Sequence, residues 1–279
     1  MTERLRHPSD PSDARWELIE PILTARRDRR RAGVLDIGRP HEHDLRTIMD
    51  AILYVDRTGI PWRHPPHDHP PRQTVHGHFR LRRDDEIFTR ISGPLHRPVR
   101  MHKGRAAEPP GGVIDTQSIK TSSNVPDSDQ SIDAAKKIVG RKRSIVVDTL
   151  GLLLTVLVTA ASVQDPVAGT TLIDQIATHH PSARKTRVDG GHRQHLVEHA
   201  ATRGIDMQIV QRDPRTRGFT PLPRRRVVER TLGRLMLHRR LARDHETLPS
   251  SSQAMIHIAA IDLMSRRLTG EATLTRRGT

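Results

Sequence analysis

The sequence predicts an α/β domain with a mixed sheet, preceded by a small all-α domain of the helix-turn-helix type. Three observations support this fold class. Apolar residues recur at helical spacing through the first ninety residues, apolar runs of strand type alternate with helical patterns from residue 113 onward, and a stretch rich in Pro and Gly separates the two regions. Strands that alternate with helices are typical of α/β domains.

The helical domain is expected over residues 13–92, behind a disordered leader at residues 1–12. Its first helix is expected near 13–26, its second begins after the capping residue Asp44, and its third covers 72–91. Arg-rich helices joined by short turns indicate a helix-turn-helix module, and the same pattern fits a plain helical bundle equally well.

Residues 93–112 are expected to form a linker, because Pro and Gly are concentrated there. The α/β domain is expected over 113–270. Its first strand is VIDTQSI, and RSIVVDTLGLLLTVLVTA predicts a hairpin that turns at Leu150 and Gly151. The expected elements that follow are a helix over 166–180, the strand ARKTRVD, a helix over 193–203, the strand DMQIVQR, and helices over 225–246 and 251–268.

Three acids lie at positions in this pattern where the fold could bring them together. Asp115 is expected to end the first strand, Asp189 ends the short strand before Gly190, and Glu229 lies in a late helix. In a sheet that starts with three strands, the first is central and the fourth lies beside it, so Asp115 and Asp189 can meet and a helix packed there can add Glu229. Close carboxylates are tolerated when divalent cations offset their charge, and oxygen ligands suit Mg²⁺ or Mn²⁺. Two such ions can activate a water or a 3′-hydroxyl in phosphodiester chemistry.

The spacing of these acids is not specific by itself, because an Asp at a strand end is often a turn residue. Asp148, at the expected hairpin, is such a competitor. Other acids are also available: Asp133, Asp174, Asp206 and Asp213.

The composition limits the classes of protein to which the chain can belong. It carries 47 Lys and Arg against 32 Asp and Glu, a net charge of +15, which favours a polyanionic partner such as DNA, although a solvated Arg-rich surface gives the same count. The lack of Cys excludes disulfides, zinc ribbons and thiol catalysis. The N-terminus lacks a signal-peptide core and the longest apolar stretch, 150–163, is too short for a membrane span, so we expect a cytoplasmic, nucleoid-associated protein with no membrane partner.

Long segments on both sides of the expected linker resemble bacterial insertion-sequence transposases of the DDE class, which have a helical N-terminal DNA-binding domain and an RNase H-like catalytic domain. In the N-terminal region the resemblance is carried by GRPHEHDLRTIMDAILYVDRTGIPWR and PRQTVHGHFRLRRDD. In the catalytic region it is carried by VIDTQSIKTSSNV, IDAAKKIVGRKRSIVVDTLGLLLTVLVTAASVQD, VDGGH and LPRRRVVERTLGRLMLHRRLARDHE.

The resemblance implies that Asp115, Asp189 and Glu229 are the catalytic residues and the ligands of Mg²⁺ or Mn²⁺, two ions in all. It implies that the partner is double-stranded DNA, both the terminal inverted repeats of the element and the target. It also implies metal-dependent cleavage and strand transfer by a homo-oligomer that holds two DNA ends.

Basic residues near these motifs are expected to contact DNA. Arg225 matches a basic residue that precedes the glutamate in related transposases, and Met236 stands where a lysine is frequent, with Arg239 or Arg240 about one turn later on roughly the same helix face. The segment KKIVGRKR is also expected to face DNA. Its basic residues are Lys136, Lys137, Arg141, Lys142 and Arg143.

The chain departs from the family pattern mainly by the loss of aromatics. The family usually has aromatics at or near the following residues of this chain: Arg72, His76, His78, Arg187, His192, Arg226, Leu232 and Arg234. Changes of Trp to Arg, Tyr to His and Phe to Leu each need one T-to-C codon change. Our hypothesis is a drifted copy of low activity. The alternative is a catalytically inactive or repurposed DNA-binding protein, and a nuclease of RNA or RNA–DNA hybrids is a further class.

A Pro-rich loop, HPPHDHPP, offers His64, His67 and His69 beside Asp68. Such a set can bind a transition metal. Exposed polar residues of an ordinary loop are the simpler interpretation of the sequence.

Overall fold

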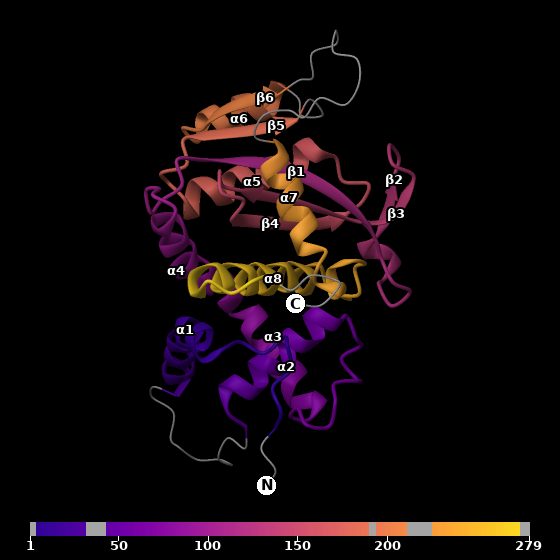
Figure 1. Cartoon of the computed structure of the whole chain (residues 1–279). Coiled ribbons are helices and arrows are strands. Elements are labelled where there is room, and N and C mark those ends of the chain that lie inside the picture. Colours follow the sequence, from indigo (N-terminus) through magenta and orange to yellow (C-terminus); the bar gives the residue numbers. More distant parts are fainter. Residues whose placement is uncertain (1–3, 32–42, 190–193, 211–224, 274–279) are drawn as a thin grey trace.

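The computed structural model describes residues 4–31, 43–189, 194–210 and 225–273. Helices from the N-terminal part of the chain lie on one side of the molecule and the sheet lies on the other (Figure 1). The long helix α8 (Pro249–Thr269) runs between them (Figure 1).

Four helices form the N-terminal part: α1 (Asp13–Arg31), α2 (Leu45–Thr58), α3 (Arg72–Asp84) and α4 (Ile87–His102). The side chain of Asp44 accepts a hydrogen bond from the Thr47 amide at 2.7 Å, which confirms it as the cap of α2. Gly59 ends α2 with a φ of 75°, the left-handed conformation that glycine adopts most easily.

Three local expectations for this part are wrong. The first helix continues beyond residue 26, to Arg31, and the helix expected over 72–91 breaks at Glu86, which has a φ of 54°. The expected linker over 93–112 is helical as far as His102, with Pro94 and Pro98 inside α4. Helix α4 tolerates these prolines because its apolar side packs along α8.

The expected disordered leader is also wrong for the residues that the structure describes. Arg4 bonds to Asp10 and to Asp50 of α2, both at 2.7 Å, and Ser9 is buried. The amide of Asp10 donates to the His7 carbonyl at 2.9 Å. The segment is therefore folded against the helical part from Arg4 onward.

The sheet has six strands: β1 (Gly111–Lys120), β2 (Ser131–Asp133), β3 (Ile138–Val147), β4 (Leu153–Ala160), β5 (Lys185–Asp189) and β6 (Asp206–Val210). The strand order is β2-β3-β1-β5-β6, and β4 pairs with β3. Strand β3 is antiparallel to β1 and β4, whereas β5 is parallel to β1 and β6 is parallel to β5. This mixed order, with β1 between β3 and β5, confirms the expected α/β fold of the RNase H-like class.

The catalytic part also contains α5 (Asp165–His179), α6 (Gln194–Thr202), α7 (Arg225–Leu235) and the 3₁₀ turns η1 (Asp127–Asp129) and η2 (Arg239–Leu241). The expected long helix over 225–246 is wrong, because α7 ends at Leu235. After that end, His238 turns inward and its Nδ1 atom lies 2.5 Å from a carboxylate oxygen of Asp56 on α2.

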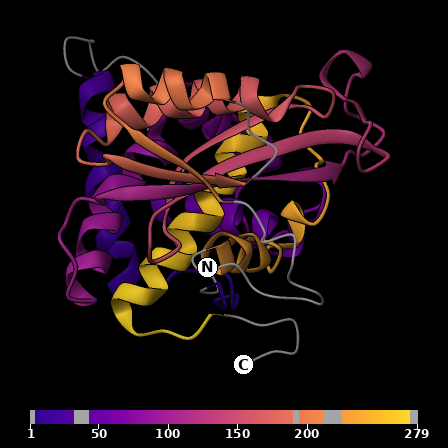
Figure 2. The same cartoon turned by 90° about the horizontal axis from the view of Figure 1, so that it is seen from above.

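Alternate residues of the strands feed two apolar cores, one on each face of the sheet. Ile114, Val146 and Val188 pack with α5 and α6, whereas Val113 and Ile145 pack with α7 and α8. Figure 2 shows α5 and α6 on one side of the strands and α7 on the other.

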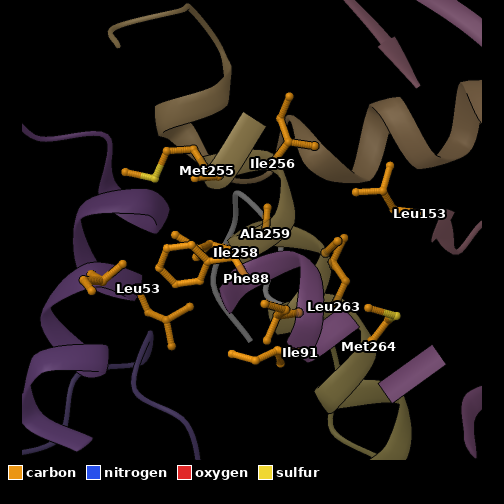
Figure 3. Packing of buried hydrophobic residues seen from close by; sticks show 14 of the residues in the cluster. Leu53, Phe88, Ile91, Leu153, Met255, Ile256, Ile258, Ala259, Leu263 and Met264 are labelled. Carbon is orange, nitrogen blue, oxygen red and sulfur yellow. The ribbon is translucent and has the colours of Figure 1, made fainter. Parts of the chain in front are cut away.

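The core on the α7 and α8 face continues into the N-terminal helices. Side chains from α2, α4 and α8 interdigitate there, with Leu153 of β4 nearby (Figure 3). The labelled residues are Leu53, Phe88, Ile91, Leu153, Met255, Ile256, Ile258, Ala259, Leu263 and Met264. The helical part and the sheet part thus share one core.

Candidate active site

Asp115 lies on the face of the sheet that α7 covers. Successive side chains of a strand point to opposite faces, and Val113, two residues earlier, packs in the core with α7. Asp115 does not end its strand, since β1 continues to Lys120. The first four residues of β1 are buried, and the four that follow, from Asp115 to Ser118, are half-buried.

Asp189 lies at the end of β5, the strand that pairs with β1 in parallel. The last pair of their ladder is Val113 with Arg187, and Asp115 and Asp189 each lie two residues beyond it. Val188 packs in the opposite core, which places Asp189 on the same face as Asp115.

Glu229 lies on α7, which packs against β1 and β3 and meets α8 (Figure 1). Val228 is fully buried under this helix, and the Thr231 hydroxyl donates to the Gly151 carbonyl at 2.9 Å, which fixes α7 to the β3–β4 turn. The side chain of Glu229 is exposed. The structure therefore places Asp115 and Asp189 on the same face of two paired strands, and Glu229 on the helix that covers this face.

The competing acids have structural roles in the described part of the chain. Asp148 is fully buried and accepts from the amides of Leu150 and Leu152 at 2.8 and 2.9 Å, as expected of a turn residue. Burial alone would raise the pKa of Asp148, but its contacts with His96, the Leu152 amide and Arg100 outweigh burial and hold that pKa below its usual range.

Three other competing acids are engaged elsewhere. The pairs are Asp133 with Ser118, Asp174 with His199 and Arg203, and Asp206 with Lys185. Asp213 lies outside the described residues, as does His192, and the side chain of Arg225 is also outside them.

The structure separates the basic residues expected to contact DNA into two groups. Lys136 and Lys137, in the turn before β3, are exposed, and so is Arg239. The remaining four are buried: Arg141, Lys142, Arg143 and Arg240.

The buried group does not support the DNA-facing role expected of it, because these side chains bind the protein itself. Arg141 donates to the carbonyls of Asp129, Glu246 and Thr247 at 2.9, 2.6 and 2.8 Å. Arg240 bonds to Glu246 at 2.7 Å and to the Ile60 carbonyl at 2.9 Å, and it lies in η2 rather than on α7. Lys142 bonds to Asp165, and Arg143 bonds to the Leu241 carbonyl.

The structure describes the surroundings of two residues, His76 and Arg226, at or near which aromatics were expected from the resemblance. His76 lies between aromatic rings, 5.1 Å from Trp62 and 6.2 Å from Phe79 between centroids, and burial lowers its pKa. Arg226 is exposed rather than turned into the core, so it does not carry the cost of a buried charge.

A cavity of about 630 Å³, which the sequence did not indicate, lies beside the paired segments of β1 and β5. It is lined by Val113 and Val227, on the α7 face, and by four basic residues, Arg100, Arg105, Lys185 and Arg187. Arg187, two residues before Asp189 on β5, shares its face of the sheet. Such an arrangement can bind phosphate groups next to the acids.

The donor set fits a hard divalent cation. Asp115, Asp189 and Glu229 offer carboxylate oxygens only, the ligands that Mg²⁺ and Mn²⁺ prefer. Asp115 also accepts a hydrogen bond from the Thr116 amide at 2.9 Å.

Comparison with known protein families agrees with this site. Residues 12–92 match the family described as "Putative transposase of IS4/5 family", and residues 106–263 match the family described as "Transposase DDE domain". No match was found among curated proteins or among solved structures. Within the described residues, no helix is long and apolar enough to cross a membrane. The chain therefore belongs to the insertion-sequence transposases with a DDE domain, polynucleotidyl transferases that act on DNA with divalent metal ions.

Proposed function

We propose that this transposase binds the terminal inverted repeats of its own insertion sequence, cuts the DNA there and joins the ends to a target. Asp115, Asp189 and Glu229 are the catalytic residues in this proposal. The observation that supports it is the pairing of β1 with β5, since both strands carry an aspartate on the face of the sheet that the helix of Glu229 covers.

The metal in this proposal is Mg²⁺ or Mn²⁺, with two ions held between the three carboxylates. Bound there, the ions would lower the pKa of a water or a 3′-hydroxyl and stabilise the leaving oxygen of a phosphodiester. The chain's own part is to fix the geometry. Strands β1 and β5 carry Asp115 and Asp189 two residues beyond the last pair of their ladder, and Thr231 holds α7, with Glu229, against the turn at Gly151.

The phosphates of the DNA would meet the exposed basic residues around the acids. The cavity beside the paired segments of β1 and β5 offers the exposed Arg105 and Lys185 and the half-buried Arg187, and the turn before β3 adds Lys136 and Lys137. Arg239 is also exposed, and Arg225 is the first residue of α7. Contacts of this kind supply most of the affinity for DNA and make it depend on salt.

Two DNA ends must meet before strand transfer, so the active form in this proposal is a homo-oligomer in which each copy brings one end. The alternative is a protein that still binds DNA but has lost the chemistry, as expected of a drifted copy. Both an active transposase and an inactive copy would bind DNA, but only the active transposase would cut DNA in the presence of the metal.

The test uses purified protein and a plasmid that carries the gene's flanking DNA. Nicks are mapped in the presence of Mg²⁺ or Mn²⁺ for the native protein, for Asp115→Asn, and for Asp127→Asn, an exposed acid of η1 that serves as the matched control. Cuts at the element ends that vanish only in Asp115→Asn support the proposal. Salt-dependent binding without cuts supports the inactive alternative, and cutting confined to RNA–DNA hybrids contradicts both.

A further inference from the structure

A group of potential metal ligands lies far from the sheet, where the N-terminal segment meets the loop between α2 and α3. His7 comes from the segment, and Asp68 and His69 come from the loop. One ligand atom from each residue lies within 4.8 Å of the other two, and Nε2 of His7 is 3.0 Å from Oδ2 of Asp68.

His69 is the unusual member of this group. Its side chain is only 6% exposed, and neither of its ring nitrogens has a hydrogen-bond partner within the described part of the chain. Buried polar atoms are normally hydrogen-bonded, and a buried group without a partner costs free energy. A ring with two unpartnered nitrogens beside a carboxylate and a second imidazole is therefore a candidate metal ligand.

The surroundings hold these side chains in place. The Tyr54 ring lies 4.7 Å from the His7 ring and 5.1 Å from the His69 ring between centroids. The two imidazoles are stacked, 5.1 Å apart with planes 22° from parallel. The His7 amide donates to Asp10 at 2.9 Å, which fixes the backbone that carries His7.

We propose that His7, Asp68 and His69 form a binding site for a divalent transition metal, with Zn²⁺ as the best match. Two imidazole nitrogens and one carboxylate oxygen are a common zinc set, and a water would complete a tetrahedron. Around tetrahedral zinc the donor atoms are about 3.4 Å apart, given metal–ligand distances of about 2.0–2.1 Å. The three ligand atoms lie within 4.8 Å of one another and must therefore move slightly closer together when the metal binds. His7 and Asp68 can supply that movement, because their side chains are 27% and 37% exposed.

This site differs in chemistry and in place from the carboxylates on the sheet. Imidazole nitrogens favour zinc, cobalt, nickel and copper, whereas Mg²⁺ favours oxygen. The metal would tie the N-terminal segment to the loop that precedes α3, where His7 already contacts Asp68. The consequence is a helical domain that is more stable when the metal is bound.

The experiment titrates metal-free, full-length protein with Co²⁺ in excess Mg²⁺, which occupies oxygen-ligand sites. Three proteins are compared: the native chain, His7→Ala, and His67→Ala, whose exposed imidazole lies in the same loop but outside the group. Visible absorption reports tetrahedral Co²⁺, and elemental analysis after Zn²⁺ loading and dialysis gives the stoichiometry.

The native protein and His67→Ala should each bind one equivalent tightly, and Zn²⁺ should raise their melting temperatures. His7→Ala should bind at least about tenfold more weakly, a loss already typical when only a supporting partner of a metal ligand is removed. Because His7 is partly exposed, its removal should leave the metal-free melting temperature close to native. Equal affinity in His7→Ala and native protein, or no tight equivalent in the native protein, would overturn the proposal.

Discussion

His238 and Asp56 form a buried contact between the catalytic part and the helical part of the chain. Nδ1 of His238 lies 2.5 Å from Oδ2 of Asp56, and the side chains are 1% and 0% exposed. Nε2 of His238 lies 3.6 Å from a carboxylate oxygen of Asp262 on α8. Burial alone would lower the pKa of His238, but the charges of Asp56 and Asp262 outweigh it and raise that pKa above its usual range.

Removing Asp56 should therefore destabilise the whole chain. Asp56→Ala leaves a buried imidazole without its main partner, and breaking a buried charged pair typically costs about 3–5 kcal/mol. The free energy of unfolding from urea titrations measures the effect. Asp84→Ala, at an exposed acid of α3, is the control and should change stability little. A loss as small for Asp56→Ala as for Asp84→Ala would show that the contact does not hold the two parts together.

The turn at Gly151 should be intolerant of any side chain. Its φ is +77°, and an added Cβ would lie 2.6 Å from Oγ1 of Thr231 on α7. Gly151→Ala should lower the free energy of unfolding by about 1–3 kcal/mol and should also slow DNA cleavage, because α7 carries Glu229. Gly233 lies on α7, and no atom lies within 4 Å of a Cβ added there. Gly233→Ala should therefore raise the free energy of unfolding by about 0.5–1 kcal/mol. The same sign of change in both variants would contradict the packing described for α7.

His257 should make the chain sensitive to acid. It is buried in α8, and burial lowers its pKa to about 4. The folded protein favours the neutral form of His257. The stability that this residue contributes is therefore complete above the unfolded pKa of about 6.5, and it is lost as the pH falls towards 4. The full loss corresponds to about 3 kcal/mol.

The measurement compares the native protein with His257→Gln by chemical denaturation at pH 7 and at pH 4. From pH 7 to pH 4, the native protein should lose more unfolding free energy than His257→Gln does. The extra loss should be most of the ~3 kcal/mol given above for about 2.5 pKa units. His102→Gln, an exposed position on α4, should show no such shift. A difference that stays constant with pH for His257→Gln would refute the assignment.

Exposed and buried basic residues should behave differently in DNA binding. Replacing Lys136 and Lys137 by Gln should weaken binding to all sequences and reduce the slope of affinity against salt by about 0.9 for each phosphate that is no longer neutralised. Arg141→Gln should leave that slope unchanged and should reduce stability by roughly 3–5 kcal/mol, because Arg141 is fully buried. Binding titrations over a range of salt concentrations, with melting curves beside them, distinguish the two effects. A lower salt slope in Arg141→Gln would show that its charge reaches DNA.

The neighbouring positions of β1 and β5 were predictable from local pattern and from simple rules of chain connection, whereas the short strand β2 was not predicted. VIDTQSI, the hairpin around Gly151 and the short strand before Asp189 could each be recognised, and the neighbouring positions of β1 and β5 followed. The side of the sheet on which Asp115 lies was settled only by the packing of Val113 and Ile114 in different cores.

Other features depend on contacts between distant residues, which spacing does not reveal. Pro94 and Pro98 indicated a linker, yet Ile91, Leu95 and Val99 repeat at helical spacing and are buried, so packing outweighs the cost of the prolines. Arg141 looked like a surface residue because two of its three carbonyl partners come from more than a hundred residues later in the chain.

The central claim is that Asp115, Asp189 and Glu229 surround the same metal ions, and cleavage of the protein itself by bound iron tests it most directly. Fe²⁺ with ascorbate and peroxide generates radicals that cut the backbone near the ion, and mass spectrometry locates the cuts. We predict cuts near all three residues, which excess Mg²⁺ suppresses and which Asp115→Asn loses together. Cuts near only one of the three, or cuts near Asp189 and Glu229 that persist in Asp115→Asn, would contradict a shared site.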